Sequence, residues 1–194
     1  IRGLLESVLK DKDIAPLLMR APAAKSIHHA YLGGLLEHIV SIVDVMETLV
    51  EHYSFLNRDL LVFGAIFHDI GKISELGFES GIHYTDRGRL VGHMAIACEM
   101  IDTAAAKISS FPAPLKDILK HIVLSHHGKI EYGSPKLPML PEALVVAMID
   151  DLDSKLNTVS HFLQNEVENL PTDEKWSRYH PGLERYFYLE YFRK

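Results

Sequence analysis

Residues 57–72 read Asn-Arg-Asp-Leu-Leu-Val-Phe-Gly-Ala-Ile-Phe-His-Asp-Ile-Gly-Lys. Asn57 is typical of a helix N-cap, because its side-chain oxygen can accept hydrogen bonds from the free amides of the first turn. The apolar run that follows predicts a helix to about His68, and Gly71 is typical of a residue that ends one. The stretch therefore places a His-Asp pair at the end of a largely buried helix.

Helical spacing of apolar residues recurs on both sides of this stretch. We expect further helices over residues 4–10, 14–19, 33–53, 91–109, 115–125 and 141–165. Residues rich in Gly, Pro and polar side chains predict loops over 74–90 and 128–141, and an irregular segment over 171–182. Aromatic residues at the end of the chain predict a short closing helix. No strand is required, so the sequence predicts an all-α fold.

The bulk composition sets broad limits. The 194 residues are 47% hydrophobic, which is enough for a sizeable core, and the net charge of −6 argues against a broad nucleic-acid surface. One cysteine, Cys98, and no visible signal peptide or membrane span favour a cytoplasmic protein with no membrane partner. The chain begins at Ile1 rather than Met, which favours a fragment of a longer protein.

Twelve histidines are several times the number that an average composition would supply. Two adjacent pairs stand out, His68-Asp69 and His126-His127. Single candidates on other predicted helices are His38, His93 and Asp150. Each of five successive predicted helices carries one such residue or one adjacent pair. Any one of them alone is explained as well by packing or by solvation, but packing does not explain their recurrence on every helix.

Imidazole nitrogen and carboxylate oxygen are ligands that suit zinc, manganese, iron and similar divalent ions. Five histidines and two aspartates are more than one ion needs. A shared aspartate could bridge two ions about 3.5–4 Å apart. The sequence therefore predicts a metal centre of two divalent ions.

The order of these residues resembles that of the HD-domain superfamily of metal-dependent phosphohydrolases, and His68-Asp69-Ile70-Gly71-Lys72 resembles its signature. The resemblance covers about residues 28–157 and implies an HD-domain helical bundle. It further implies that one ion is held by His38, His68, Asp69 and Asp150, and the other by Asp69, His93, His126 and His127. It also implies catalytic roles for Asp69 and Lys72, with the Lys72 ammonium on a substrate phosphate.

Further segments are similar to the HD domain of YhaM-type 3′→5′ exoribonucleases. They are residues 28–38, 92–93, 125–129, 133–136 and 150–155, in the same order and at similar spacing. That family carries an OB-type nucleic-acid-binding domain before the HD domain, so a longer form of this protein is expected to have one. The resemblance implies RNA or a nucleotide as the phosphate-ester substrate.

Residues around the predicted centre have open roles. His28, His29, Arg87, Arg89 and Lys129 could contact substrate phosphate, or they could be structural or solvated. Asp153 shares a helix face with Asp150 and could support a ligand or be solvated. We expect a helical lead-in over residues 1–27, the HD domain over 28–166 and an irregular C-terminal segment with an aromatic helix over 167–194.

The leading interpretation is a phosphodiesterase of the 3′–5′ exoribonuclease type. A nucleotide phosphomonoesterase is the alternative within the same chemistry. A di-iron oxygenase and a non-catalytic regulatory module are less favoured, the last because a degenerate module has no need of seven ligands.

Overall fold

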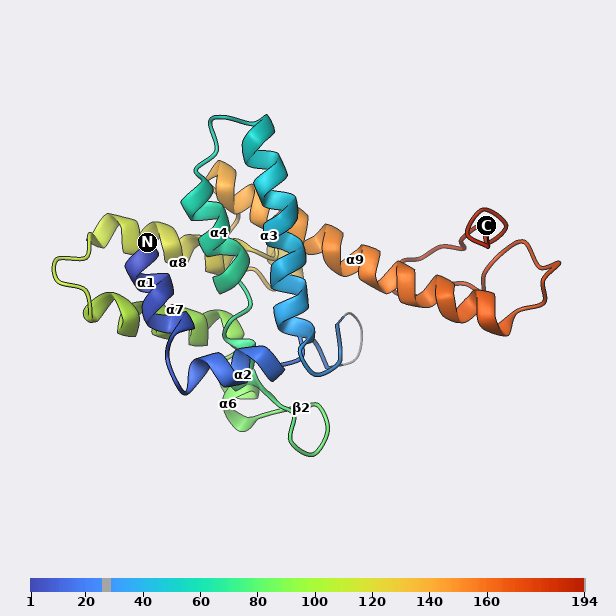
Figure 1. The fold of residues 1–194 in the computed structure, drawn as a ribbon, viewed down its shortest axis with the longest axis horizontal. Coiled ribbons are helices and arrows are strands. Elements are labelled where there is room, and N and C mark those ends of the chain that lie inside the picture. The colour runs from blue at the N-terminus through green and yellow to red at the C-terminus, as the bar shows by residue number, and fades with distance from the viewer. Residues whose placement is uncertain (26–28, 194) are drawn as a thin grey trace. The chain divides into compact units, whose positions relative to one another are not determined.

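The computed structural model describes residues 1–25 and 29–193 of the chain (Figure 1). His28, a candidate substrate contact, lies outside the described residues. Contacts divide the chain into two compact units, Ile1–Asp153 and Ser154–Lys194. The domain boundaries expected from the sequence, after residues 27 and 166, stay a prediction.

The first unit is a bundle of helices. Its elements are α1 (Arg2–Leu9), α2 (Ile14–Arg20), α3 (Gly34–His52), α4 (Arg58–Phe67), α5 (Lys72–Glu75), β1 (Leu76–Gly77), β2 (His83–Tyr84), α6 (Asp86–Leu90), α7 (His93–Ala106), α8 (Ala113–Ser125), the 3-10 turn η1 (Ile130–Tyr132) and the first part of α9 (Pro141–Asn169). Helix α3 packs against α4, α7 against α8, and α4 against α8 (Figure 1). The largest fully buried side chains include Phe63, Phe67 and Met46, which place the core beside α3 and α4.

The predicted start of α4 is confirmed. The Asn57 side chain accepts hydrogen bonds from the amides of Asp59 and Leu60 at 3.0 and 3.2 Å. Gly71 follows α4 in a tight turn that leads into α5. A Cβ atom at Gly71 would lie 2.1 Å from the carbonyl oxygen of His93, so only glycine lets this turn approach the start of α7 so closely.

The expectation of a plain loop over residues 74–90 is wrong, and so is the expectation that the chain needs no strand. Strands β1 and β2 pair in antiparallel register, Leu76 opposite Tyr84 and Gly77 opposite His83. Helix α6 follows, capped by the Thr85 hydroxyl, which accepts from the Gly88 amide at 2.9 Å. This small hairpin leaves the all-α class intact, because helices make up nearly all of the regular structure.

The second unit consists of the end of α9 and the chain that follows it. The expected aromatic closing helix is wrong: the described residues after α9 contain no helix, and isolated antiparallel bridges join Trp176 to Tyr188 and His180 to Arg185. Backbone donors of this segment bond across it instead of along a helix, as when the Ser177 amide donates to the Phe187 carbonyl at 2.9 Å.

No helix in the described part of the chain is long and apolar enough to cross a membrane.

Candidate metal centre

The predicted ligands come from helix ends that the bundle brings together. His38 lies in the first half of α3, and His68 is the C-cap of α4. His93 is the first residue of α7, and His126 is the C-cap of α8. Asp150 lies in α9 and faces these residues, whereas Asp151 beside it is exposed. The structure thus brings Asp150, and not Asp151, next to the other candidate ligands.

A first group of four residues, His38, His68, Asp69 and Asp150, brings ligand atoms within 4.8 Å of one another. The Nε2 atoms of His38 and His68 are 3.2 Å apart, and His38 Nε2 is 3.2 Å from Asp150 Oδ1. His68 Nε2 is 3.4 Å from Asp69 Oδ2. Two imidazole nitrogens on one tetrahedral zinc ion, each about 2.0–2.1 Å from it, lie roughly 3.3–3.4 Å apart. The spacing of the first group therefore suits a single small cation.

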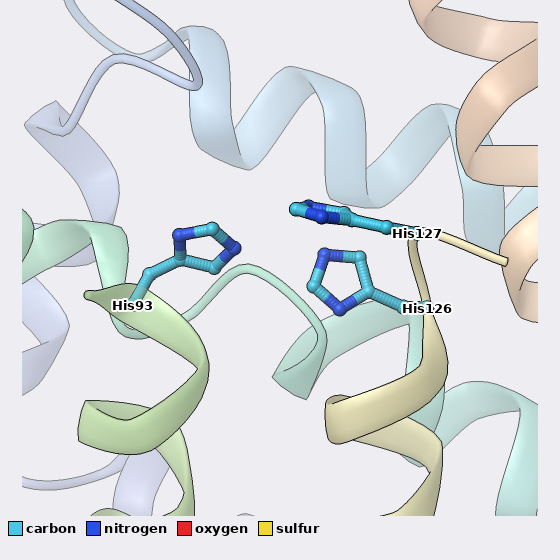
Figure 2. Close-up of side chains that lie close together, drawn as sticks. All are labelled: His93, His126 and His127. Atoms are coloured by element: carbon cyan, nitrogen blue, oxygen red, sulfur yellow. The ribbon is translucent and has the colours of Figure 1, made fainter. Parts of the chain in front are cut away.

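A second group contains His93, His126 and His127, whose ring atoms also come within 4.8 Å of one another. Figure 2 shows the three rings turned toward one another, His93 from the start of α7 and the other two from the end of α8. Asp69 lies between the two groups. Its Oδ2 atom faces the first group, and its Oδ1 atom is 3.6 Å from His93 Nε2 and 3.7 Å from His126 Nε2.

Backbone carbonyls hold three of the five rings from behind. The Nδ1 atom of His68 lies 3.0 Å from the Ala65 carbonyl oxygen, that of His126 lies 2.7 Å from Val123, and that of His127 lies 2.9 Å from Tyr132. A carbonyl oxygen can only accept, so each Nδ1 must carry the hydrogen. The Nε2 lone pair of each ring is therefore left for the interior of the site.

Carboxylates hold the other two rings. His38 Nδ1 lies 2.7 Å from Asp153 Oδ2, and His93 Nδ1 lies 3.0 Å from Glu75 Oε1. Asp153 also accepts from the Ser41 hydroxyl, so the solvated role left open for it is excluded. Glu75 was missed by the sequence analysis. Its only signal is an acidic residue one turn after Lys72 in an otherwise apolar run, and nothing in that run points to His93.

Three buried polar atoms at the meeting point of the two groups have no hydrogen-bond partner among the described residues: Asp69 Oδ1, His93 Nε2 and His126 Nε2. Leaving buried acceptors unpaired is costly, on the order of 1–3 kcal/mol for each group. All three are ligand atoms of the types that divalent transition metals take. The residues present therefore fit a metal, which would bind atoms that nothing else satisfies.

Burial and neighbouring charges shift the pKa values of the site residues in different directions. Burial, and then the nearby His68, lower the pKa of His126 to about 3, so its ring is neutral at neutral pH. Burial opposes the charge of Asp69, but Lys72 and His68 hold its pKa well below the ordinary value. Burial likewise opposes the charge of His38, but hydrogen bonds with Asp150 and Asp153 raise its pKa to about 9.

The candidate substrate contacts that the structure describes have different surroundings. The Lys72 ammonium lies at the site, 2.5 Å from Asp69 Oδ2. His29 is buried, with Nε2 3.2 Å from Asp153 Oδ2 and Nδ1 3.0 Å from the Tyr31 hydroxyl, so it lies behind His38 and not on an open surface.

Two further candidates, Arg87 and Lys129, are exposed and already ion-paired. Arg87 pairs with Glu99, and Lys129 pairs with Glu131 at 3.2 Å. No described side-chain contact joins either cation to a ligand residue, so the structure does not bring them into the site.

The chain belongs to the HD domain family, whose model matches residues 35–155. The match contains all seven predicted ligands. HD domains bind divalent metals, in agreement with the histidine and aspartate cluster.

Curated relatives include the 3′-5′ exoribonuclease YhaM of Geobacillus sp. (strain WCH70), which is 43% identical over 143 residues, 74% of this chain and 44% of the relative. The 3′-5′ exoribonuclease YhaM of Bacillus subtilis (strain 168) is 38% identical over 176 residues, 91% of this chain and 54% of the relative. The chain thus spans about half the length of these relatives. No solved structure gave a significant match.

Proposed function

We propose that this chain is a metal-dependent phosphohydrolase that cleaves phosphodiester bonds, of the 3′–5′ exoribonuclease type. One observation carries the proposal. The two carboxylate oxygens of Asp69 face two separate sets of histidine Nε2 atoms, at 3.4 Å to His68 on one side and 3.6 Å to His93 on the other. This is the arrangement that a carboxylate bridging two ions requires.

Two divalent ions, manganese, iron or zinc, are the cofactors of the proposal. His38, His68, Asp69 and Asp150 would hold one, and Asp69, His93, His126 and His127 the other. When bound, such a pair supplies Lewis acidity at a phosphoryl oxygen and activates water for attack on phosphorus. We place all seven of these ligands in the catalytic machinery.

Other side-chain and backbone groups orient the histidine rings and neutralise the charge of Asp69. The five Nδ1 contacts orient the rings so that their Nε2 atoms face the interior of the site. Lys72 balances the Asp69 carboxylate at 2.5 Å. We propose that its ammonium also binds a phosphate oxygen of the substrate. As a compact cation it is suited to stabilise the charge that develops on that oxygen.

RNA is the proposed substrate, since the curated relatives carry the name 3′-5′ exoribonuclease. We propose that an OB-type nucleic-acid-binding domain serves the same protein, in keeping with relatives about twice as long as the matched region. The cytoplasmic location expected from the single cysteine stays a prediction.

The decisive experiment measures metal content and diester cleavage on the same protein. After reconstitution with excess manganese, elemental analysis should approach two ions per chain, and the protein should hydrolyse bis-p-nitrophenyl phosphate. Asp69→Ala should lose both ions and all turnover, because both ions use this carboxylate. Asp151→Ala, one residue from a ligand but exposed, is the matched control and should retain both.

Other outcomes would overturn the proposal. A stoichiometry of one ion that His93→Ala does not change would contradict the binuclear centre. Release of phosphate from nucleotide monophosphates with no diester cleavage under any metal would favour a phosphomonoesterase. Oxygen consumption by an iron-loaded form would favour an oxygenase.

A further inference from the structure

A groove of about 560 Å³ lies beside the small hairpin, lined by Lys25, Tyr84, Gly88 and Arg89. Strand β2 and helix α6 form one wall and pack side by side (Figure 1). All four residues belong to the first unit of the chain. Neither the family match, which names only the HD domain, nor the seven ligands account for this groove.

The charge of the groove is positive and uncompensated. Within the described part of the chain, neither the Arg89 guanidinium nor the Lys25 ammonium makes an ion pair or a side-chain hydrogen bond, and no carboxylate lines the groove. Arg87, two residues before Arg89 on the same short helix, is by contrast paired with Glu99. Two exposed and unpaired cations on one concave surface favour an anionic ligand with more than one charge.

An aromatic ring accompanies the two cations. Tyr84 is 41% exposed, although its backbone is held opposite Leu76 in the hairpin. A ring that is fixed at its base and open on its face can stack on a nucleobase, and every base presents such a face. Cations along a groove together with an aromatic ring are the features with which proteins bind single-stranded nucleic acid.

One residue of the groove packs against the support of the second ligand group. A Cβ atom at Gly88 would lie 2.2 Å from the Glu75 carbonyl oxygen, so Gly88, which lines the groove, is in close contact with the Glu75 backbone. The Glu75 carboxylate in turn accepts from the His93 amide and from His93 Nδ1, both at 3.0 Å. Glu75 therefore contacts both a residue that lines the groove, Gly88, and a proposed metal ligand, His93.

We propose that this groove is a subsite for a single-stranded nucleic acid whose scissile phosphate lies at the metal centre. Arg89 and Lys25 bind backbone phosphates away from the bond that is cut, and Tyr84 stacks on a base. This inference rests on the proposed function and adds a subsite that distinguishes an oligonucleotide from a minimal diester. It also assigns phosphate binding to Arg89 rather than to Arg87.

The test compares two substrates of different length on the manganese-loaded chain. Arg89→Ala and Lys25→Ala should each raise KM for a single-stranded hexaribonucleotide by on the order of 10-fold, as expected for a lost charged contact. Both should leave metal content and the hydrolysis of bis-p-nitrophenyl phosphate unchanged, because that diester has neither a second phosphate nor a nucleobase for the groove to bind. Arg58→Ala is the control, since Arg58 is an exposed arginine at the opposite end of α4 from His68.

Binding of the labelled hexamer, followed by fluorescence anisotropy without metal, separates this inference from the catalytic proposal. The slope of log K against log salt should fall by about 0.7 for each lost phosphate contact. Tyr84→Ala should lower the affinity for the hexamer by about 10-fold and leave the affinity for an abasic hexamer unchanged.

Any of three results would overturn the subsite. Arg89→Ala could leave hexamer binding unchanged, or Arg87→Ala could weaken hexamer binding more than Arg89→Ala does. The third is an equal loss of activity of Arg89→Ala on the hexamer and on bis-p-nitrophenyl phosphate. If the wild-type chain cleaves neither substrate, the catalytic proposal fails, whereas the binding measurements still decide the groove.

Discussion

The orientation of each histidine ring in the centre depends on the group that its Nδ1 atom contacts. Three rings donate Nδ1–H to backbone carbonyls, and two donate to carboxylates, His38 to Asp153 and His93 to Glu75. A carboxylate partner makes an imidazole a more basic ligand and fixes its orientation. One such ring belongs to each ligand group, so Asp153 and Glu75 would be positioning residues for the two proposed ions separately.

Glu75→Gln should weaken the second ion selectively. The glutamine keeps the size of the side chain but removes the charge that supports His93. The affinity of the second ion should fall about 10–100-fold, while the first ion, which His93 does not touch, binds as before. Isothermal titration with manganese and the absorption spectrum of the cobalt-substituted protein measure the two ions without relying on turnover.

Glu79→Gln is the matched control, because Glu79 is exposed and lies four residues further along the same segment. Equal weakening of both ions in Glu75→Gln would show that Glu75 supports the bundle as a whole rather than His93.

At the scale of elements, the end of α9 and the chain after it are joined by one buried carboxylate. Glu166 is fully buried and accepts from the Arg178 amide at 2.6 Å and from its guanidinium at 2.9 Å. The hydrogen bonds from Arg178 lower the pKa of Glu166. The strand-like return of the chain therefore depends on a charged carboxylate on α9.

Acid should release this segment. Because the pKa of Glu166 is lower in the folded chain than in the unfolded chain, the pair contributes its full stability above the ordinary glutamate value near 4.5. That contribution is lost as the pH falls below this value and through the lowered pKa. The single tryptophan, Trp176, lies in the segment, so its fluorescence should change below about pH 4.5.

Glu166→Gln should show the acid form of the spectrum already at neutral pH, since it removes the same charge. Glu168→Gln, an exposed neighbour on α9, should behave like the wild type. A spectrum of Glu166→Gln that matches the wild type at every pH would show that the segment is held without this pair.

At the scale of the whole molecule, the metal-loaded site of our proposal and the chain differ in the sign of their charge. With two ions bound, the site and Lys72 would form a positive region able to hold one or two phosphates, whereas the chain as a whole carries −6. A negative surface gains little from counterion release along a polyanion. Affinity for a long strand therefore has to come from a limited set of cations or from an additional domain.

The chain of residues 1–194 should accordingly cleave short diesters well and long RNA poorly. We expect manganese-dependent hydrolysis of bis-p-nitrophenyl phosphate and of a short oligonucleotide, with much lower kcat/KM on a transcript of a few hundred nucleotides. A form that carries an OB-type domain should restore cleavage of the transcript. Equal efficiency on short and long RNA, unaffected by salt, would contradict this division of labour.

The sequence by itself predicted the longer helices of the bundle and supplied the candidate ligands. The Asn57 cap, the apolar spacing of α3 and α4, and the His and Asp residues at helix ends depend on neighbours a few positions away, and such signals are local. Its errors at β1, β2 and the C-terminal segment have the opposite cause, because cross-strand hydrogen bonds there outweigh local preference.

Only the tertiary structure decided how the ligands are divided and supported. The two oxygens of Asp69 face different groups because α3, α4, α7 and α8 converge on one point. Asp153 is 115 residues from His38, and Glu75 is 18 residues from His93. No periodicity links positions so far apart along the chain. They meet because the core brings their helices together, and that is why the groups behind the histidines could not be read from the sequence.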